Sequence, residues 1–397
     1  MRIAMVGQKS IPARYGGVER AVEEVAARLV EQGHDVTCFN WKEKGEEMPR
    51  YHRGIRLRYV PAVGGKHLRN MSQSVVATIA TLVGDYDIVH YHALGPTLAS
   101  PIARLRPTTK VVVTIQGRDD QRAKWSPPAR AVLGLAAWVA AKVPHAGIAV
   151  SKQLQKEFLE EFGRRTVHIP NGVAAREAPA SYTPEEMPEH FGLTSGRYLA
   201  MVGRLVPEKA ADQLIRAYRN VPTDVQLAII GGSSHTDEYV ERLHSLAEAD
   251  DRVILTGPVY GNGIDSLFRH AMGYVMPSLL EGLPLALLEG ISYGLPVAVS
   301  DIPPHVEVVG ADGPGHRVFR AGDIEHMTKQ LTALVTDPEG ENAAAQRQTA
   351  RVLHEYSWEG ITNRTRSVYE ALLDDRDPTD EIAPLPAAPG TEAANQV

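Results

Sequence analysis

Short runs of apolar residues alternate with segments of helical periodicity along the first 170 residues of the chain. Apolar residues recur every three or four positions from Ala21 to Val30, and Gly33 marks the end of the helix that this spacing predicts. The run at residues 111–115 is typical of a strand buried on both faces. Strands separated by helices in this way predict a parallel sheet covered on both sides. The predicted strands are residues 3–6, 36–39, 88–92, 111–115, 148–150 and 167–169.

The alternation breaks at residues 174–190, where Ala, Pro and Glu accumulate, and then restarts. We therefore predict an α/β chain of two Rossmann-like, doubly wound parallel-sheet domains, at residues 1–175 and 193–355, joined by a linker at residues 176–192. The second half contains predicted strands at residues 198–202, 225–230, 253–255, 274–276 and 297–299, with helices at 210–219 and 238–249.

The end of the chain departs from this alternation. Residues 356–373 have the pattern of an amphipathic helix. Residues 374–397 are acidic and rich in Pro and Ala, a composition that cannot bury a core, so we expect a disordered tail.

Length and composition agree with two domains and favour a particular cellular compartment. A chain of 397 residues is too long for one compact core. Its one cysteine, Cys38, lies in an apolar run and predicts a small buried side chain that suits a reducing compartment. The first apolar run ends at Gly7 and is too short for a secretory signal, and no run reaches the length of a membrane span. We therefore expect a cytoplasmic protein.

The net charge of −6 is unevenly distributed. Residues 1–170 hold 25 Lys and Arg against 15 Asp and Glu, and the rest of the chain holds 17 against 33. A basic first half favours an anionic partner, either a membrane surface or a phosphorylated acceptor. Ordinary variation in surface charge explains the asymmetry equally well.

Two doubly wound domains bind their ligand at the carboxyl ends of their strands. Gly16 and Gly17 follow the first predicted strand and precede the first helix, where glycine lets a phosphate approach the backbone. A tight turn is the alternative. The loop at residues 7–17 is too long for a dinucleotide fingerprint, so we predict neither a nicotinamide nor a flavin enzyme.

A second candidate follows the first strand of the second domain. Arg204 and Lys209 flank one loop just before a helix, where two cations can hold a diphosphate and neutralise the charge on a leaving phosphate. A solvated pair of charges at a helix start is the alternative.

The third candidate is the most specific. Glu281 and Glu289 are separated by seven residues, with a turn between them that leads into a helix. We expect Glu281 in the loop and Glu289 about two turns into the helix, on the same face. The amides of the helix start can bind phosphate, and Glu289 can accept hydrogen bonds from a ribose. A surface charge is the alternative for Glu289.

These segments, with Asn171-Gly172-Val173 and the Trp358 helix, resemble the family 4 retaining glycosyltransferases of the GT-B fold. The resemblance extends from Met1 to about Leu373. It implies an acceptor domain and a nucleotide-sugar donor domain that face each other across a cleft, with the helix at residues 356–373 returning to the first domain. It also implies sugar transfer to a hydroxyl acceptor with retention of configuration, by front-side attack and without a metal or other cofactor.

The resemblance also implies the roles of the candidate residues. Arg204 and Lys209 would hold the donor diphosphate, Glu281 the donor sugar, and Glu289 the ribose. Gly16 and Gly17 would contact phosphate from the first domain. The remaining donor contacts would come from the backbone at Gly282, Leu283, Leu285 and Ala286.

One position departs from the family pattern. Members commonly carry a histidine in a Thr-x-His-Gly context after the strand at residues 111–115, where this chain has Gln116. Gln116 can donate and accept hydrogen bonds but cannot titrate. His92, one strand earlier, is a further candidate for contact with the acceptor or the sugar. Asp85 and Asp87 resemble a metal-binding pair, but they lead directly into a strand, so we interpret them as structural.

Residues 11–19 and 122–125 are similar to bacterial transferases that build capsule and exopolysaccharide repeats, rhamnosyltransferases among them. This similarity implies a lipid-linked acceptor at the inner face of the plasma membrane and no nucleic-acid partner. The apolar stretch from Trp125 to Trp138, between Arg122 and Lys142, has the pattern of an interfacial helix. A core helix is the alternative.

Three other functions remain open from the sequence. A sugar-nucleotide epimerase can share this fold, a small molecule can be the acceptor, and an inactive sugar-nucleotide-binding regulator would keep the binding motifs without the chemistry.

Overall fold

The computed structural model describes residues 1–13, 16–42, 48–62, 69–121, 125–177, 179–234 and 236–382. The chain divides into two compact units. The first contains Met1–Gly172 together with the described chain from Tyr356 onward, and the second contains Val173–Glu355.

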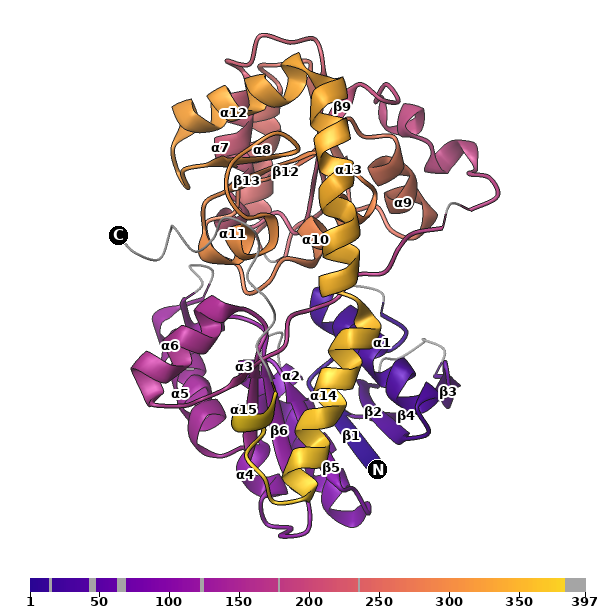
Figure 1. Ribbon diagram of the computed structural model, residues 1–397, viewed down its shortest axis with the longest axis vertical. Coiled ribbons are helices and arrows are strands. Elements are labelled where there is room, and N and C mark those ends of the chain that lie inside the picture. The colour runs from indigo at the N-terminus through magenta and orange to yellow at the C-terminus, as the bar shows by residue number, and fades with distance from the viewer. Residues whose placement is uncertain are drawn as a thin grey trace. The chain divides into compact units, whose positions relative to one another are not determined.

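The first unit is built on an eight-stranded sheet in the order β3-β4-β2-β1-β5-β6-β7-β8 (Figure 1). All neighbouring strands are parallel except β3 and β4. The strands are β1 (Arg2–Val6), β2 (Asp35–Trp41), β3 (Tyr51–His52), β4 (Ile55–Val60), β5 (Ile88–His92), β6 (Lys110–Ile115), β7 (Ala146–Ala149) and β8 (Val167–His168).

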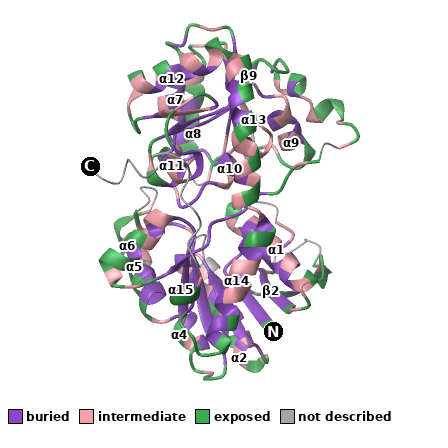
Figure 2. Ribbon diagram, viewed as in Figure 1, coloured by how far each residue is buried: buried purple, intermediate pink, exposed green. Residues whose placement is uncertain are grey.

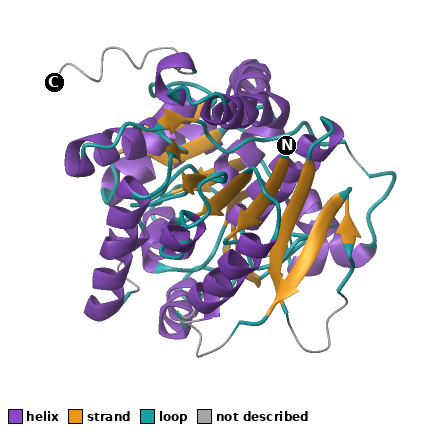
Figure 3. Cartoon of the chain, turned by 90° about the horizontal axis from the view of Figure 1, so that it is seen from below, coloured by secondary structure: helices purple, strands orange, loops and turns teal. Residues whose placement is uncertain are grey.

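Helices cover this sheet (Figure 3), as expected for parallel strands that are buried on both faces. Cys38 is fully buried in β2, as predicted for a small apolar side chain. The helices are α1 (Gly17–Glu31), α2 (Arg69–Val83), α3 (Leu94–Thr97), α4 (Ser100–Ala103), the 3₁₀ turn η1 (Asp119–Gln121), α5 (Pro127–Lys142), α6 (Lys152–Phe162), α14 (Trp358–Leu373) and α15 (Pro378–Glu381).

Helix α14 brings the end of the chain back to the first unit and lies beside α1 (Figure 1). At its start, Trp358 packs against Gly172, where a Cβ atom would lie 2.5 Å from the indole ring. Further along, the Tyr369 hydroxyl lies 2.6 Å from His90 Nδ1, and Arg364 Nη2 donates to the carbonyl oxygen of His168 at 2.9 Å. The apolar face predicted for residues 356–373 is therefore buried within this unit.

The second unit contains a six-stranded, fully parallel sheet in the order β11-β10-β9-β12-β13-β14. Most residues of these strands are buried (Figure 2). The strands are β9 (Tyr198–Val202), β10 (Gln226–Ile230), β11 (Val253–Gly257), β12 (Gly273–Met276), β13 (Val297–Ser300) and β14 (His316–Phe319). The helices are η2 (Pro184–Glu186), η3 (Pro188–Phe191), η4 (Pro207–Lys209), α7 (Ala211–Tyr218), α8 (Asp237–Ala247), α9 (Asn262–Arg269), α10 (Leu285–Ser292), α11 (Pro303–Val309), α12 (Ile324–Thr336) and α13 (Pro338–Glu355).

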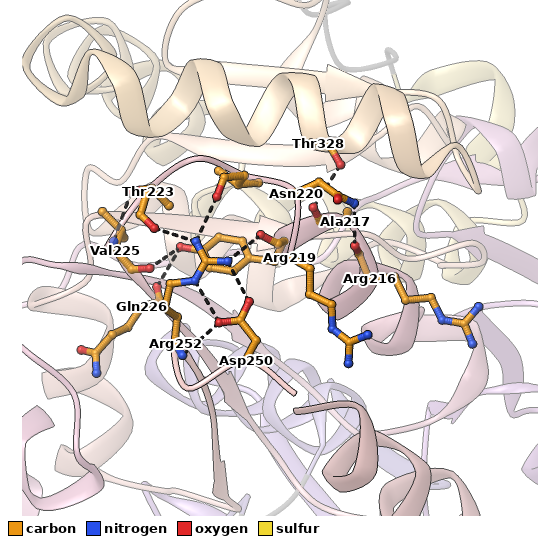
Figure 4. A network of polar contacts seen from close by, with 12 residues as sticks. Arg216, Ala217, Arg219, Asn220, Thr223, Val225, Gln226, Asp250, Arg252 and Thr328 are labelled. Carbon is orange, nitrogen blue, oxygen red and sulfur yellow. Dashed lines mark hydrogen bonds and ion pairs between the residues drawn. The ribbon is translucent and has the colours of Figure 1, made fainter. Parts of the chain in front are cut away.

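One arginine forms hydrogen bonds to several loops at the edge of this sheet (Figure 4). Arg252 donates to both carboxylate oxygens of Asp250, at 2.9 and 2.7 Å. Its other bonds reach the carbonyl oxygens of Val221, Thr223 and Tyr218 at 2.9, 2.6 and 3.3 Å. The guanidinium therefore stabilises the end of α7 and the start of β11 at once.

Three strands and two further segments differ from the sequence prediction. Strands β3, β4 and β14 were not predicted. Residues 176–192, predicted as a linker, belong to the second unit and carry η2 and η3, and there Tyr182 donates to Asp265 of α9. Residues 374–382, predicted as part of a disordered tail, contain α15, whose Asp380 pairs with Arg165 at 2.7 Å. The rest of the predicted tail, 383–397, lies outside the described residues.

Candidate active site

The loop after β9 lies against the backbone of the loop after β10. A Cβ atom on Gly231 would lie 1.8 Å from the carbonyl oxygen of Gly203, so only glycine fits there. The Leu205 amide donates to the carbonyl oxygen of Gly232 at 2.9 Å. This backbone contact sets the path of the loop that carries Arg204, whose side chain is exposed, and Lys209, which ends η4.

Lys209 and Glu281 form a largely buried ion pair in which the ammonium group donates to Glu281 Oε1. Burial by itself would raise the pKa of Glu281. The Lys209 ammonium outweighs that effect, with smaller contributions from His305 and Ser278, and holds the pKa of the carboxyl below its ordinary value. Glu281 is therefore an ionised acceptor at neutral pH.

Glu289 lies closer to the start of its helix than predicted. Because Pro284 is the N-cap residue, Glu289 is the fifth residue of α10, little more than one turn in rather than about two. Burial raises the pKa of its carboxyl, and Arg176, whose Nη2 donates to Glu289 Oε1 at 3.1 Å, opposes that shift. Arg176 was not predicted from the sequence as a site residue.

A second residue that the sequence analysis missed is His305, near the start of α11. It is fully buried, and its Nδ1 lies 3.1 Å from the carbonyl oxygen of Ser300 and 3.0 Å from Ser300 Oγ. Its Nε2 is buried without a hydrogen-bond partner among the described residues. His305 is close enough to Glu281 and Lys209 for each to influence its pKa. Its signal in the sequence is weak, because a histidine after two prolines has no motif of its own.

In the first unit, α1 begins at Gly17, and Gly16 is its N-cap residue with φ of +97°. A side chain at Gly16 would be strained, and a Cβ atom there would lie 2.6 Å from Glu19 Oε2. Both glycines are exposed, so their backbone is accessible to a ligand. Arg14 and Tyr15, which precede them, lie outside the described residues.

His92 and Gln116 lie at the carboxyl ends of the adjacent strands β5 and β6. The His92 ring is buried 4.2 Å from the ring of His90, and neither of its nitrogens has a hydrogen-bond partner among the described residues. Burial lowers the pKa of His92 to about 3. Gln116 Oε1 accepts a hydrogen bond from Asn171 Nδ2 at 3.2 Å. Asn171 of the Asn-Gly-Val motif therefore orients the residue that stands in place of the family histidine.

Asp85 and Asp87 have structural partners, as interpreted from the sequence. Asp85 pairs with Arg2 and Arg106 at 2.8 and 2.5 Å, and Asp87 Oδ2 accepts from the Arg2 amide at 2.6 Å. Within the described ranges, no three His, Cys, Asp or Glu side chains come together in a way that could hold a metal ion.

The structure thus distributes the predicted site residues over the two units. In the second unit it brings Lys209 and Glu281 into contact and places Glu289 on the helix that follows Glu281. The turn between the two glutamates is formed by Gly282, Leu283 and Pro284, and Leu285 and Ala286 open the helix. Gly16, Gly17, His92 and Gln116 belong to the first unit.

Helix α5 has two different faces. Small residues on one side, Ala136 and Ala137 among them, pack into the first unit. On the other side Leu135 and Trp138 are 55% and 51% exposed. No helix in the described part of the chain is long and apolar enough to span a bilayer. Arg122 and Lys124, part of the predicted membrane segment, lie outside the described residues.

Two parallel-sheet α/β units with these loops define the GT-B fold of glycosyltransferases. The solved structure of sucrose-phosphate synthase from Thermosynechococcus elongatus superposes with a TM-score of 0.80. The superposition covers 94% of this chain and 99% of that one, at 19% sequence identity.

The sequence matches two family descriptions, "Glycosyltransferase Family 4" over residues 15–177 and "Glycosyl transferases group 1" over residues 184–352. Together these matches span both units, and the chain is a glycosyltransferase of the family 4 type. The predicted enzyme class and fold class are thereby confirmed. The narrower similarity to rhamnosyltransferases stays a prediction.

Two relatives have names that state both the donor and the acceptor. The GDP-mannose-dependent alpha-(1-6)-phosphatidylinositol monomannoside mannosyltransferase of Mycolicibacterium smegmatis is 29% identical over 82% of this chain and 87% of its own length. The UDP-Gal:alpha-D-GlcNAc-diphosphoundecaprenol alpha-1,3-galactosyltransferase of Escherichia coli is 26% identical over 81% of this chain and 85% of its own.

Proposed function

We propose that this enzyme transfers a sugar, with retention of configuration and without a metal ion, from a nucleoside-diphosphate sugar to a lipid-linked hydroxyl acceptor in the synthesis of a cell-envelope polysaccharide or glycolipid. The observation that carries the proposal is the largely buried Lys209–Glu281 pair beside the start of α10. An ammonium group held in place by a carboxylate provides a fixed positive charge for a diphosphate.

In this mechanism the two cations act on the leaving group. Lys209 and Arg204 bind the donor diphosphate and neutralise the charge that grows on it as the glycosidic bond breaks. Glu281 accepts hydrogen bonds from hydroxyls of the donor sugar, and Glu289 accepts them from the ribose. A diphosphate oxygen takes the proton of the acceptor hydroxyl, so no protein side chain has to titrate at that step. Gln116 in place of a histidine is compatible with this route because its role is hydrogen bonding alone.

The names of the relatives support a lipid-linked acceptor. One acts on a phosphatidylinositol mannoside and the other on a sugar linked to diphosphoundecaprenol. Their donors differ, GDP-mannose in one and UDP-galactose in the other. The nucleotide base and the sugar of this enzyme's donor therefore have to be determined by experiment.

An acceptor embedded in a membrane requires the enzyme to approach the bilayer, and α5 has a suitable face. Leu135 and Trp138 are exposed one turn apart, and the basic residues Arg130 and Lys142 are exposed on the same helix. Aromatic and aliphatic side chains beside basic ones are typical of a helix that lies in the headgroup region. We therefore place the enzyme at the cytoplasmic face of the membrane as a peripheral protein.

Flotation with vesicles that contain phosphatidylglycerol tests this contact. At low salt the parent should float with the vesicles, and L135S/W138S should bind about tenfold more weakly because it loses apolar area that would enter the membrane. Ile79→Ser on α2 is the matched control, since Ile79 is also 51% exposed, and it should float like the parent. A parent that does not float at low salt would exclude the membrane contact.

A donor screen tests the function itself. The purified enzyme is mixed with UDP-, GDP-, ADP- and dTDP-sugars, with and without a lipid extract, and released nucleoside diphosphate is measured. We expect release from one donor that rises with lipid and persists in EDTA, and a product with the donor's anomeric configuration by NMR. Conversion of a donor to its epimer would support the epimerase alternative, and binding without turnover would support a binding protein.

A further inference from the structure

Arg176 contacts Glu289 from the segment that begins the second unit. Its Nη2 donates to Glu289 Oε1 at 3.1 Å, and the two side chains are 29% and 17% exposed. Among the described residues Glu289 is its one ion-pair partner. The Nε atom of Arg176 is buried and has no hydrogen-bond partner among the described residues. A buried donor left unpaired costs stability, so packing alone does not explain why an arginine stands at this position.

We propose that Arg176 is a positioning residue for the nucleotide site, which holds the Glu289 carboxylate in the orientation that receives the ribose hydroxyls. This inference rests on the proposed function, since it takes Glu289 as the ribose-binding group. Ribose hydroxyls are donors to a carboxylate, and one guanidinium N–H bound to Oε1 restricts the rotation of that carboxylate.

Among the described residues, Arg176 is the cation that pairs with Glu289. Two phenols also interact electrostatically with Glu289, Tyr274 of β12 and Tyr293 directly after α10. The Tyr293 hydroxyl is already used, since it donates to Asp265 at 2.6 Å. Arg176 supplies a positive charge that opposes the effect of burial, which raises the pKa of Glu289. Without it, protonation of Glu289 would begin at higher pH.

The alternative is that Arg176 only anchors the chain at the start of the second unit. An anchor would affect the folding of the unit and the binding of every nucleotide alike. A positioning residue affects only ligands that have ribose hydroxyls, and its effect depends on pH.

The test is calorimetric binding of UDP and GDP and of their 2′,3′-dideoxy counterparts at pH 8 and pH 6. The proteins are the parent, R176M, R176K and E289Q. In R176M we expect the ribonucleotide to bind about tenfold more weakly, the size of one charge-assisted hydrogen bond. The dideoxy nucleotide should bind as it does to the parent. The loss should be larger at pH 6, and R176K should recover part of it because it restores the charge.

Arg351→Met is the matched control. It removes a pair of similar burial in the same unit, with Glu355 at 2.7 Å and exposed fractions of 16% and 17%, and should leave both affinities unchanged.

Equal weakening of ribo and dideoxy nucleotides in R176M, or no weakening, would overturn the inference while leaving the proposed function intact. If E289Q still bound ribonucleotides more tightly than dideoxy nucleotides, or if the parent bound neither UDP nor GDP, the assignment of the donor site would be wrong. The inference about Arg176 would then be wrong as well.

Discussion

Lys209 and Glu281 show how two separate motifs become one site. They are 72 residues apart in sequence and meet in a pair whose side chains are mostly buried. Taking two charges out of water costs several kcal/mol each, and their attraction often no more than offsets it. Such a pair is weak support for stability. Its presence beside the start of α10 is better explained by chemistry on a charged ligand.

The first prediction concerns turnover at this pair. Lys209→Ala and Glu281→Ala should each lower kcat by on the order of 10²-fold or more, because each removes a contact that strengthens in the transition state. The measurement is release of nucleoside diphosphate from the donor found in the screen. Arg351→Met, on α13, is the control and should keep its activity. If both alanine variants stayed within threefold of the parent, the site would lie elsewhere.

The second prediction concerns His305 and the dependence of the protein's stability on pH. Burial lowers the pKa of His305 to about 4, from an ordinary value of 6.5. The native state then disfavours the charged form, so the unfolded state binds more protons as the pH falls. The stability that a neutral His305 contributes is complete above about pH 6.5 and is lost as the pH falls from there to about pH 4. The loss amounts to about 2 kcal/mol at pH 5.

The measurement is the melting temperature of the parent and of His305→Gln at pH 7.5 and pH 5. Glutamine does not titrate, so the parent should lose about 4–8 °C more than the variant between the two values. Equal losses would mean that His305 titrates normally in the native state.

At the scale of elements, alternation predicted some of the helices, the central strands and the edge strands β8 and β11, but missed β3, β4 and β14. In β4 buried and less buried residues alternate over Ile55–Val60, which is the pattern of a half-covered strand. No continuously apolar run marks β4 in the sequence, so this strand was not predicted. Strand β14 at His316–Phe319 has one fully buried residue, Phe319, and its pairing with β13 rather than its composition makes it a strand.

The third prediction concerns the loops tied by Arg252. Its hydrogen bonds have the fork geometry of a guanidinium, which a lysine cannot reproduce. Arg252→Lys should destabilise the second unit by about 2 kcal/mol, since hydrogen bonds to charged groups contribute about 1.5–3 kcal/mol each and part of the site is exposed.

Thermal unfolding measures this effect, with an expected fall of about 4–8 °C. Arg216→Lys is the control, because that side chain is exposed on α7 and points away from the network (Figure 4). An unchanged melting temperature in Arg252→Lys would show that the loops hold without the guanidinium.

At the scale of the whole molecule, the described part of the chain crosses between its units twice, near residues 172 and 355. The second crossing returns α14 to the first unit, where Trp358 packs against Gly172 and Tyr369 reaches His90. The first unit therefore needs a part of the chain that is made last.

The fourth prediction follows from this connectivity. A chain that ends at residue 355 should lose most of the stability of the first unit, because the apolar face that α14 covers would be exposed to water. Removal of residues 383–397 alone is the control and should change little. Limited proteolysis with peptide mapping distinguishes the units, and an intact first unit in the shorter chain would contradict the prediction.

The sequence by itself determined the two sheets, the order of most elements, and the motif residues at the strand ends, because apolar periodicity and loop chemistry are local properties. Only the tertiary structure decided which side chains meet. It pairs Lys209 with Glu281, Arg176 with Glu289 and Asn171 with Gln116, and it buries His305 close enough to the first pair for both charges to influence its pKa. Such contacts join residues far apart in the chain, so no local pattern encodes them, and the packing of strands and helices brings them together.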